Sequence, residues 1–351
     1  MIDWIVAERI AAYVAGAGDA PAPSVDLQVL AEESERRVVA YTGLTPAASL
    51  PAPEGVSRRE WVSSNIRSTR ALLDPVLTRA GKGLGPLAPA IQIGMAVILS
   101  VEVGVLVGYL AQRVLGQYEL VLLDESAEAH PPRLLFVLPN LGKAVESFGA
   151  EEREFMTWVT LHEVTHAVQF GGVPWLHGHL AGLVGELLRS AELRIDRRLT
   201  RRLPSRAEVS RALAALRHGD LIGVVMNESE RATIDRVQAV MAVIEGHAEH
   251  VMDAVAPDLL PSLPRLRRAL DACRRTQSRL SRLVGRLLGL DLKLRQYEQG
   301  KRFCDAIARD GGPAALSHVF SAPAALPSLA EIEAPATWLE RTAPQRNTTG
   351  V

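Results

Sequence analysis

The segment LHEVTHAVQF, residues 161–170, contains the residues best suited to chemistry in this chain. His162 and His166 are one helical turn apart, so on a helix both side chains lie on one face and can share a metal ion. Glu163 projects about 100° away from them, too far round to bind the same ion but within reach of a water bound to it. Two nitrogen ligands and a proton-accepting carboxylate form the HExxH pattern of zinc hydrolysis. The segment therefore predicts a zinc site with Glu163 as general base.

A catalytic zinc ion needs a third protein ligand and leaves its fourth position to water. The best candidate is Glu245, in the segment VMAVIEGHAEHVMD that covers residues 240–253. On a helix, Glu245 falls at the edge of an apolar stripe, where a carboxylate is costly unless a cation meets it. His247 and His250 are alternative third ligands, although both project away from Glu245 on the helix.

Three residues are candidates for supporting roles at such a site. Glu249 follows Glu245 by one turn and could accept a hydrogen bond from the far ring nitrogen of a histidine ligand. A solvated surface charge is an equally good interpretation of Glu249. Cleavage of a carbonyl compound also needs a donor for the oxyanion. His250 and Tyr297 are the candidates for that donor, and the sequence does not choose between them.

The elements that must position these residues are mainly helical. Two short runs, YELVLL (118–123) and RLLFVLP (133–139), have strand character and predict a hairpin just before the motif helix. Asn140 is a predicted N-cap for the following helix. Apolar periodicity predicts helices at 3–15, 26–41, 58–80, 90–115, 141–148, 151–170, 176–200, 206–217, 229–254, 264–286, 291–309 and 313–320. We therefore expect a mainly α protein with a small β-sheet, an α+β fold.

Composition places the chain among globular proteins of a reducing compartment. Its 351 residues are 48% hydrophobic, carry a formal net charge of -1 and include only two cysteines, which excludes a disulfide framework. The N-terminus lacks the uninterrupted apolar run of a secretory signal. The apolar run at 93–110 is long enough for a short membrane span, but Glu102 lies inside it, so we expect a buried core helix. The predicted location is the cytoplasm.

The chain organisation that we expect has three parts. A helical N-terminal region, residues 1–116, packs on a zinc-binding core at 117–341 or forms one domain with it. Residues 342–351 have nothing to bury and are predicted to be disordered. The sequence does not indicate an oligomeric state.

Two other classes of function remain open. In a non-catalytic protein, zinc would only join two helices, and a fourth ligand from His177, His179 or His250 would favour that interpretation. As loop or surface residues, His177 and His179 would have no such role. The arginine-rich helices could instead bind nucleic acid, but their charge is dispersed among apolar positions in a neutral chain, so a solvated face is the better interpretation. We therefore expect neither a nucleic acid nor a membrane as partner.

Beyond single motifs, an ordered set of landmarks extends over most of the chain. These are DW near the start, RREW (58–61), RVLGQYEL (113–120), FVLPN (136–140), LHEVTHAVQF (161–170), EGHAEHVMD (245–253), QYEQGKRF (296–303) and LPSLAEIEAPATWLER (326–341). In this order the chain resembles the zincin-like metallopeptidases of GC-rich bacteria labelled "coenzyme F-420 biosynthesis-associated" or hydrolase. The resemblance implies a zincin-like fold with an HExxH active-site helix. It also implies His162 and His166 as ligands, Glu163 as general base and Glu245 as third ligand, but no substrate.

Together these observations predict a zinc metallohydrolase, most readily a peptidase, with one Zn²⁺ per chain and no other cofactor. Glu163 would take a proton from the zinc-bound water as that water attacks a polarised carbonyl. A peptide or protein is the expected substrate. RLLFVLP is the predicted edge strand that aligns an extended peptide by β-augmentation.

Overall fold

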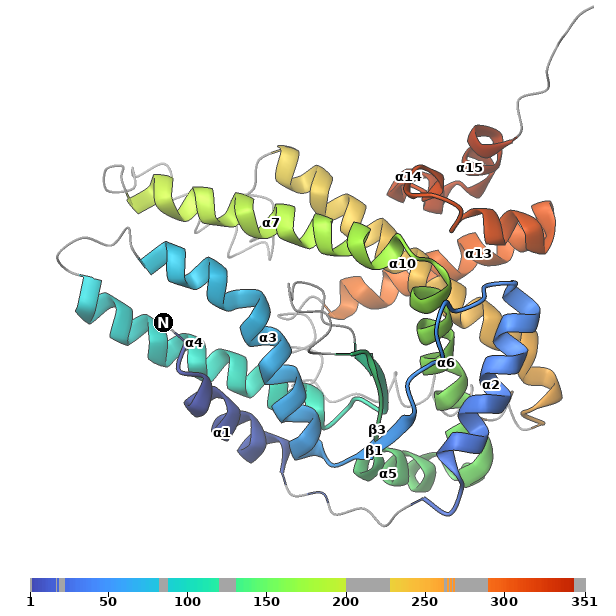
Figure 1. Cartoon of the computed structure of the whole chain (residues 1–351), viewed down its shortest axis with the longest axis horizontal. Helices are drawn as coiled ribbons and strands as arrows, with labels where there is room; N and C mark the ends of the chain where they lie inside the picture. Colours follow the sequence, from blue (N-terminus) through green and yellow to red (C-terminus); the bar gives the residue numbers. More distant parts are fainter. Residues whose placement is uncertain are drawn as a thin grey trace, which may run out of the picture.

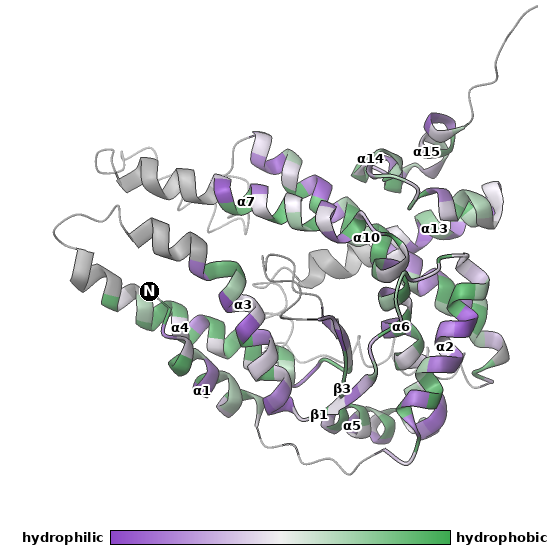
Figure 2. Cartoon of the chain, in the orientation of Figure 1, coloured by the Kyte–Doolittle hydropathy of each residue, from purple (hydrophilic) through white to green (hydrophobic). Residues whose placement is uncertain are grey.

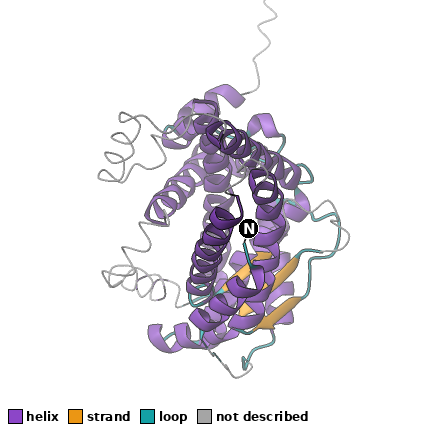
Figure 3. Ribbon diagram, turned by 90° about the vertical axis from the view of Figure 1, so that its left-hand side faces the viewer, coloured by secondary structure: helices purple, strands orange, loops and turns teal. Residues whose placement is uncertain are grey.

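The computed structural model of the chain consists mainly of helices with one three-stranded sheet (Figures 1 and 3). The residues that it describes are 2–16, 18, 23–81, 88–119, 131–199, 228–261, 264, 266, 268 and 290–343. The expectation of a mainly helical α+β protein is confirmed. The helix predicted at 206–217, most of that predicted at 264–286, and the tail from residue 344 lie outside the described residues.

Four helices form the first part of the chain, close to their predicted positions. They are α1 (Trp4–Ala15), α2 (Leu27–Thr42), α3 (Arg58–Gly81) and α4 (Ala88–Ala111). Figure 2 shows hydrophilic residues gathered on α2, at the outside of the molecule. The Asp3 and Asp26 side chains cap α1 and α2 by accepting hydrogen bonds from backbone N–H groups of the first turn.

Helices α1 and α4 run side by side in the same direction and touch through small residues. A Cβ added at Gly104 would lie 2.7 Å from the carbonyl oxygen of Ala7, and one at Gly108 would lie 2.6 Å from that of Ala11. The prediction that 93–110 forms a buried helix is only partly right. One side of α4 packs on α1 and α3, but apolar residues of the other side are exposed, namely Ile93, Val97, Ile98, Val101 and Val105. None of the helices in the described residues is long and apolar enough to span a membrane.

The sheet has the order β1-β3-β2, with β1 (Pro53–Val56) parallel and β2 (Gly116–Glu119) antiparallel to β3 (Arg133–Val137). The pairing of β2 with β3 agrees with the predicted hairpin, whereas β1 lies between the helices predicted at 26–41 and 58–80, where no strand was predicted. The prediction of RLLFVLP as an edge strand is wrong, because β3 is hydrogen-bonded on both sides. Its residues Leu134–Val137 are fully buried, as a central strand covered on both faces requires. The edge strand beside the motif helix is β2.

Asn140 does not cap a helix as predicted. Helix α5 (Leu138–Phe148) begins directly after β3 without a side-chain cap, and Asn140 lies within its first turn. The Asn140 amide donates hydrogen bonds to the carbonyl oxygens of Ala111 (2.8 Å), the last residue of α4, and of Val114 (2.6 Å), which follows the helix. Its oxygen accepts one from Arg58 Nε at 2.7 Å. Asn140 therefore joins α5 to α3 and α4, and it satisfies the Ala111 carbonyl group, which the end of the helix leaves free.

The remaining helices build the half of the chain that carries the predicted ligands. They are α6 (Glu152–Gly172), α7 (Leu176–Leu199), α10 (Glu228–Val255), α13 (Leu290–His318), α14 (Leu329–Glu333) and α15 (Pro335–Thr342). Helix α13 is kinked at Gly312, whose φ is 77°, which accounts for the two separate helices predicted there. Helix α6 lies between α2 and α10 and also contacts β2 and β3. This packing buries α6 on nearly every side.

Candidate metal centre

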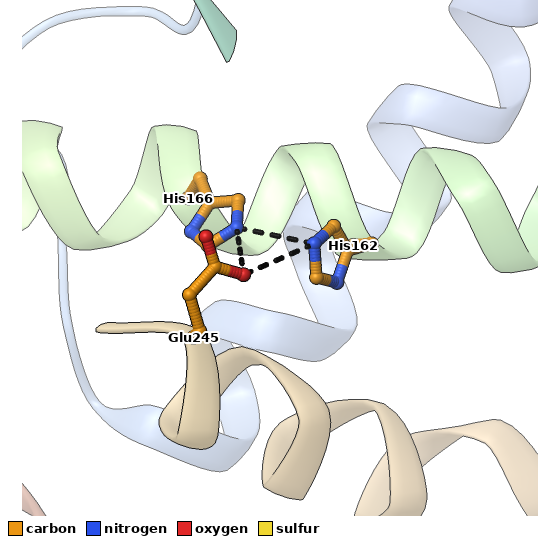
Figure 4. A group of neighbouring side chains, drawn as sticks. All are labelled: His162, His166 and Glu245. Atoms are coloured by element: carbon orange, nitrogen blue, oxygen red, sulfur yellow. Dashed lines mark hydrogen bonds and ion pairs between the residues drawn. The ribbon is translucent and has the colours of Figure 1, made fainter. Parts of the chain in front are cut away.

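His162 and His166 lie on one face of α6, as their spacing predicts (Figure 4). Their Nε2 atoms are 3.2 Å apart. The two rings meet edge to face, with centroids 4.7 Å apart and planes at 86°. Both rings therefore direct one nitrogen toward the same point.

Glu245 approaches this point from α10 (Figure 4). Its Oε2 atom is 3.7 Å from Nε2 of His162 and 3.6 Å from Nε2 of His166. Ligands about 2.0–2.1 Å from a tetrahedral zinc ion would be separated by about 3.3–3.4 Å. The three donor atoms thus have nearly the spacing that one zinc ion needs. In the described part of the chain this is also the one cluster of three or more such residues that could hold a metal.

The far nitrogens of the two imidazoles contact residues other than the predicted Glu249. His166 Nδ1 is 2.9 Å from Oε1 of Gln169, and His162 Nδ1 is 3.2 Å from the sulfur of Met252. Glu249 is only partly buried. Of these two contacts, only the one to the Gln169 amide is a hydrogen bond of the kind predicted for Glu249, because a thioether is a weak acceptor.

The alternative histidines of α10 are engaged away from the cluster. His247 is buried, with Nδ1 2.8 Å from Gln169 Nε2. His250 has a partner on each nitrogen: Asp305 Oδ1 at 2.7 Å from Nδ1, and the Tyr41 hydroxyl at 2.8 Å from Nε2. To serve as an oxyanion donor, His250 would have to give up one of them.

The other predicted candidates contribute less to the site. His177 and His179 lie in the first turn of α7 rather than in a loop, and neither joins the metal-binding cluster. The Tyr297 side chain lies outside the described residues, so its predicted role as oxyanion donor stays a prediction.

Glu163 lies against the edge strand β2. The backbone N–H of Tyr118 donates a hydrogen bond of 2.9 Å to Glu163 Oε2. A Cβ added at Gly116 would lie 2.7 Å from Glu163 Cγ, so any larger residue at this position would displace the Glu163 side chain. Burial raises the pKa of Glu163 to about 7, although His166 and the Tyr118 N–H act in the opposite direction. A carboxyl group with this pKa exchanges protons readily near neutrality.

Comparison with known proteins agrees with this geometry. The sequence profile of the zincin-like metallopeptidases matches residues 2–339. The chain belongs to the zincin-like metallopeptidase family. It is also similar to a crystal structure from Chloroflexus aurantiacus, described as a candidate hydrolase with a novel fold. The TM-score is 0.71 at 30% sequence identity, over 97% of this chain and 98% of that one. The comparison with curated proteins gives no match.

In this zincin-like chain, the electrostatics of the cluster are those of a cation site. Burial lowers the pKa of His162 to about 4, and His166 acts in the same direction. Burial also opposes charge on His166, but the hydrogen bond and the negative charge of Glu245 outweigh it and raise the pKa of His166. The Glu245 carboxylate therefore stabilises positive charge where the two Nε2 atoms converge. The donor set fits Zn²⁺, which binds imidazole nitrogen and carboxylate oxygen.

Sequence reasoning missed Gly116 and Gln169 as site residues of this zincin-like protein. A signal for each was present in the sequence. Gly116 stands in the landmark RVLGQYEL at the start of a strand, where glycine often marks a close approach of another group. Gln169 is a polar residue on the buried part of the motif helix, one turn after His166, and a buried amide needs partners.

Proposed function

We propose that this zincin-like protein is a zinc-dependent hydrolase that cleaves peptide bonds. The observation that carries the proposal is the convergence of His162, His166 and Glu245 beside the buried carboxyl group of Glu163. These residues supply three ligands and a base, and they leave a fourth position for the reacting groups. Open coordination of this kind is typical of catalytic rather than structural zinc.

The chemistry divides between the metal and the chain. When bound, a zinc ion lowers the pKa of water toward neutrality and polarises a carbonyl oxygen. Glu163 takes a proton from the attacking water and passes it to the leaving amine. Burial raises the pKa of this carboxyl group, which strengthens it as a proton acceptor. The Tyr118 N–H fixes one carboxylate oxygen and leaves the other for the water.

The edge of β2 is the surface that we assign to the substrate, in place of the β3 segment predicted from the sequence. Strand β2 pairs with β3 along one edge, and the Tyr118 N–H on its other edge is directed at Glu163. An extended peptide added along this edge would run past the general base. This placement favours a peptide or protein over a small ester as the substrate.

A non-catalytic zinc protein is the alternative. It requires a fourth protein ligand, and the metal-binding cluster within the described residues has three members. His250, one candidate fourth ligand, is held by Tyr41 and Asp305 instead.

The family that the sequence resembles is labelled with coenzyme F-420 biosynthesis. That label adds no chemistry to this site, so we propose no step of coenzyme synthesis. The cytoplasmic location stays a prediction.

The proposal is tested by metal analysis and a peptide-library cleavage assay on the wild-type protein and on Glu163→Gln. We expect about one zinc per chain in both proteins and cleavage by the wild type alone, because Glu163 is not a ligand. Glu163→Gln removes the base while preserving side-chain shape. Zinc without cleavage in the wild type, across a library of all residue pairs, would favour the structural alternative. Equal cleavage by Glu163→Gln would refute the role of Glu163.

A further inference from the structure

We propose that Gln169 is a positioning residue that uses a single amide to orient His166 and to hold the helix that carries Glu245. The inference rests on the proposed function, because it concerns the same zinc site. Gln169 is fully buried on α6, one turn after His166. Its side chain bonds to groups on both ligand-bearing helices.

One backbone carbonyl group fixes the direction of every hydrogen bond in this arrangement. The carbonyl oxygen of Ile244 can only accept, so the group 2.9 Å away must be the Gln169 amide nitrogen, as it is placed. The amide oxygen therefore faces Nδ1 of His166, which must carry a hydrogen to donate. A neutral imidazole with its hydrogen on Nδ1 has its lone pair on Nε2. Nε2 is the atom that lies beside Glu245.

The second hydrogen of the amide nitrogen goes to His247. Nδ1 of His247 is 2.8 Å from Gln169 Nε2 and must act as the acceptor. His247 is itself buried, with its ring edge to face on Phe320 at a centroid distance of 4.9 Å. Both amide hydrogens and the amide oxygen therefore have partners, so the Gln169 side chain has one preferred orientation.

The bond to Ile244 links the two halves of the metal site. Ile244 directly precedes Glu245 on α10, whereas Gln169 belongs to the helix of His162 and His166. A shift of α10 along α6 that moved Glu245 relative to the histidines would also stretch this bond. Gln169 thus sets the register between the carboxylate ligand and the imidazole ligands.

Among the described residues, the contact behind His162 is weaker. His162 Nδ1 faces the thioether sulfur of Met252 at 3.2 Å, and a thioether is only a weak acceptor. Loss of the contact behind His162 should therefore matter less than loss of the contact behind His166. This difference provides a matched comparison within one site.

The test measures zinc affinity by competition with a chromophoric chelator, and it needs no substrate. Gln169→Met keeps the length of the side chain and removes its amide, and we expect zinc binding to weaken by about 10- to 100-fold. Met252→Leu, the matched control, should weaken it by less than about 3-fold, since it removes only a weak acceptor. The visible spectrum of the cobalt-loaded protein should change with Gln169→Met, because the geometry of a ligand changes, and should stay unchanged with Met252→Leu.

A second measurement on the unaltered protein covers the case in which Gln169→Met fails to fold. Long-range nitrogen–proton NMR spectra of the zinc-loaded, histidine-labelled protein should show His166 with its hydrogen on Nδ1 and the metal on Nε2. Metal on Nδ1 of His166, or equal zinc affinity in Gln169→Met and the wild type, would overturn the inference and leave the proposed function intact. A wild-type protein that binds no zinc would overturn both.

Discussion

Gly116→Ala should slow catalysis while leaving the metal in place. Gly116 lies in β2 directly against Glu163, and its φ is not among the positive values found in this chain. The backbone at this position therefore accepts alanine, and the effect of the substitution is steric. A methyl group there would have to share its space with the side chain of the proposed general base.

The size of the expected loss in rate follows from the steric overlap between the new Cβ and Glu163. The new Cβ would lie 2.7 Å from Glu163 Cγ and 3.1 Å from Cδ and Oε1, whereas carbon atoms in contact are about 3.5–4.0 Å apart. Glu163 must therefore retreat by about 1 Å, and a displacement of this size in a catalytic group costs about 100-fold in rate. This corresponds to about 2.7 kcal/mol in the activation free energy. Removal of a general base costs about 10²- to 10⁴-fold, which sets the upper limit of the effect.

The assay compares kcat and zinc content of Gly116→Ala with those of the wild type, on a peptide that the wild type cleaves. Gly142→Ala is the matched control, because a Cβ there meets nothing within 4 Å. In a Glu163→Gln background the substitution should have little further effect, since both changes act on the same step. Unchanged kcat in Gly116→Ala would refute the steric argument. If a loss of zinc accounted for the loss of rate, the substitution would have disturbed the metal ligands as well as the general base. That result would refute the prediction.

Three further predictions concern single residues. Glu245→Ala should lose zinc in metal analysis, because it removes one of three ligands; full zinc occupancy would exclude Glu245 as a ligand. Gly300→Ala should destabilise the protein by about 1–3 kcal/mol or more in denaturant unfolding, since its Cβ would lie 1.9 Å from the carbonyl oxygen of Ala242 where α13 crosses α10. Asn140→Ala should cost about 2–3 kcal/mol, because the carbonyl groups of Ala111 and Val114 and a charged donor each lose a partner. An unchanged unfolding midpoint would contradict either stability prediction.

The sequence by itself determined the helices and the chemistry of the motif. Apolar periodicity is a local property, so it placed both ends of α1, α2, α6 and α10 to within two residues. The spacing of His162 and His166 placed both on one face for the same reason. Glu245 was recognisable because a carboxylate at the edge of an apolar stripe requires a cation.

Only the tertiary structure decided which groups from distant segments meet. Strand β1 is four residues long and carries no local signal, and it exists because β3 offers it an edge. Whether RLLFVLP is central or at the edge depends on that same partner, which lies about eighty positions earlier in the chain. Contacts with groups on other elements, or one turn away, define the roles of Asn140, Gln169 and Gly116. Because such hydrogen bonds and steric contacts leave no periodic pattern in the sequence, periodicity does not reveal them. Sequence thus determined which side chains lie on each face of a helix, and packing determined which groups those side chains contact.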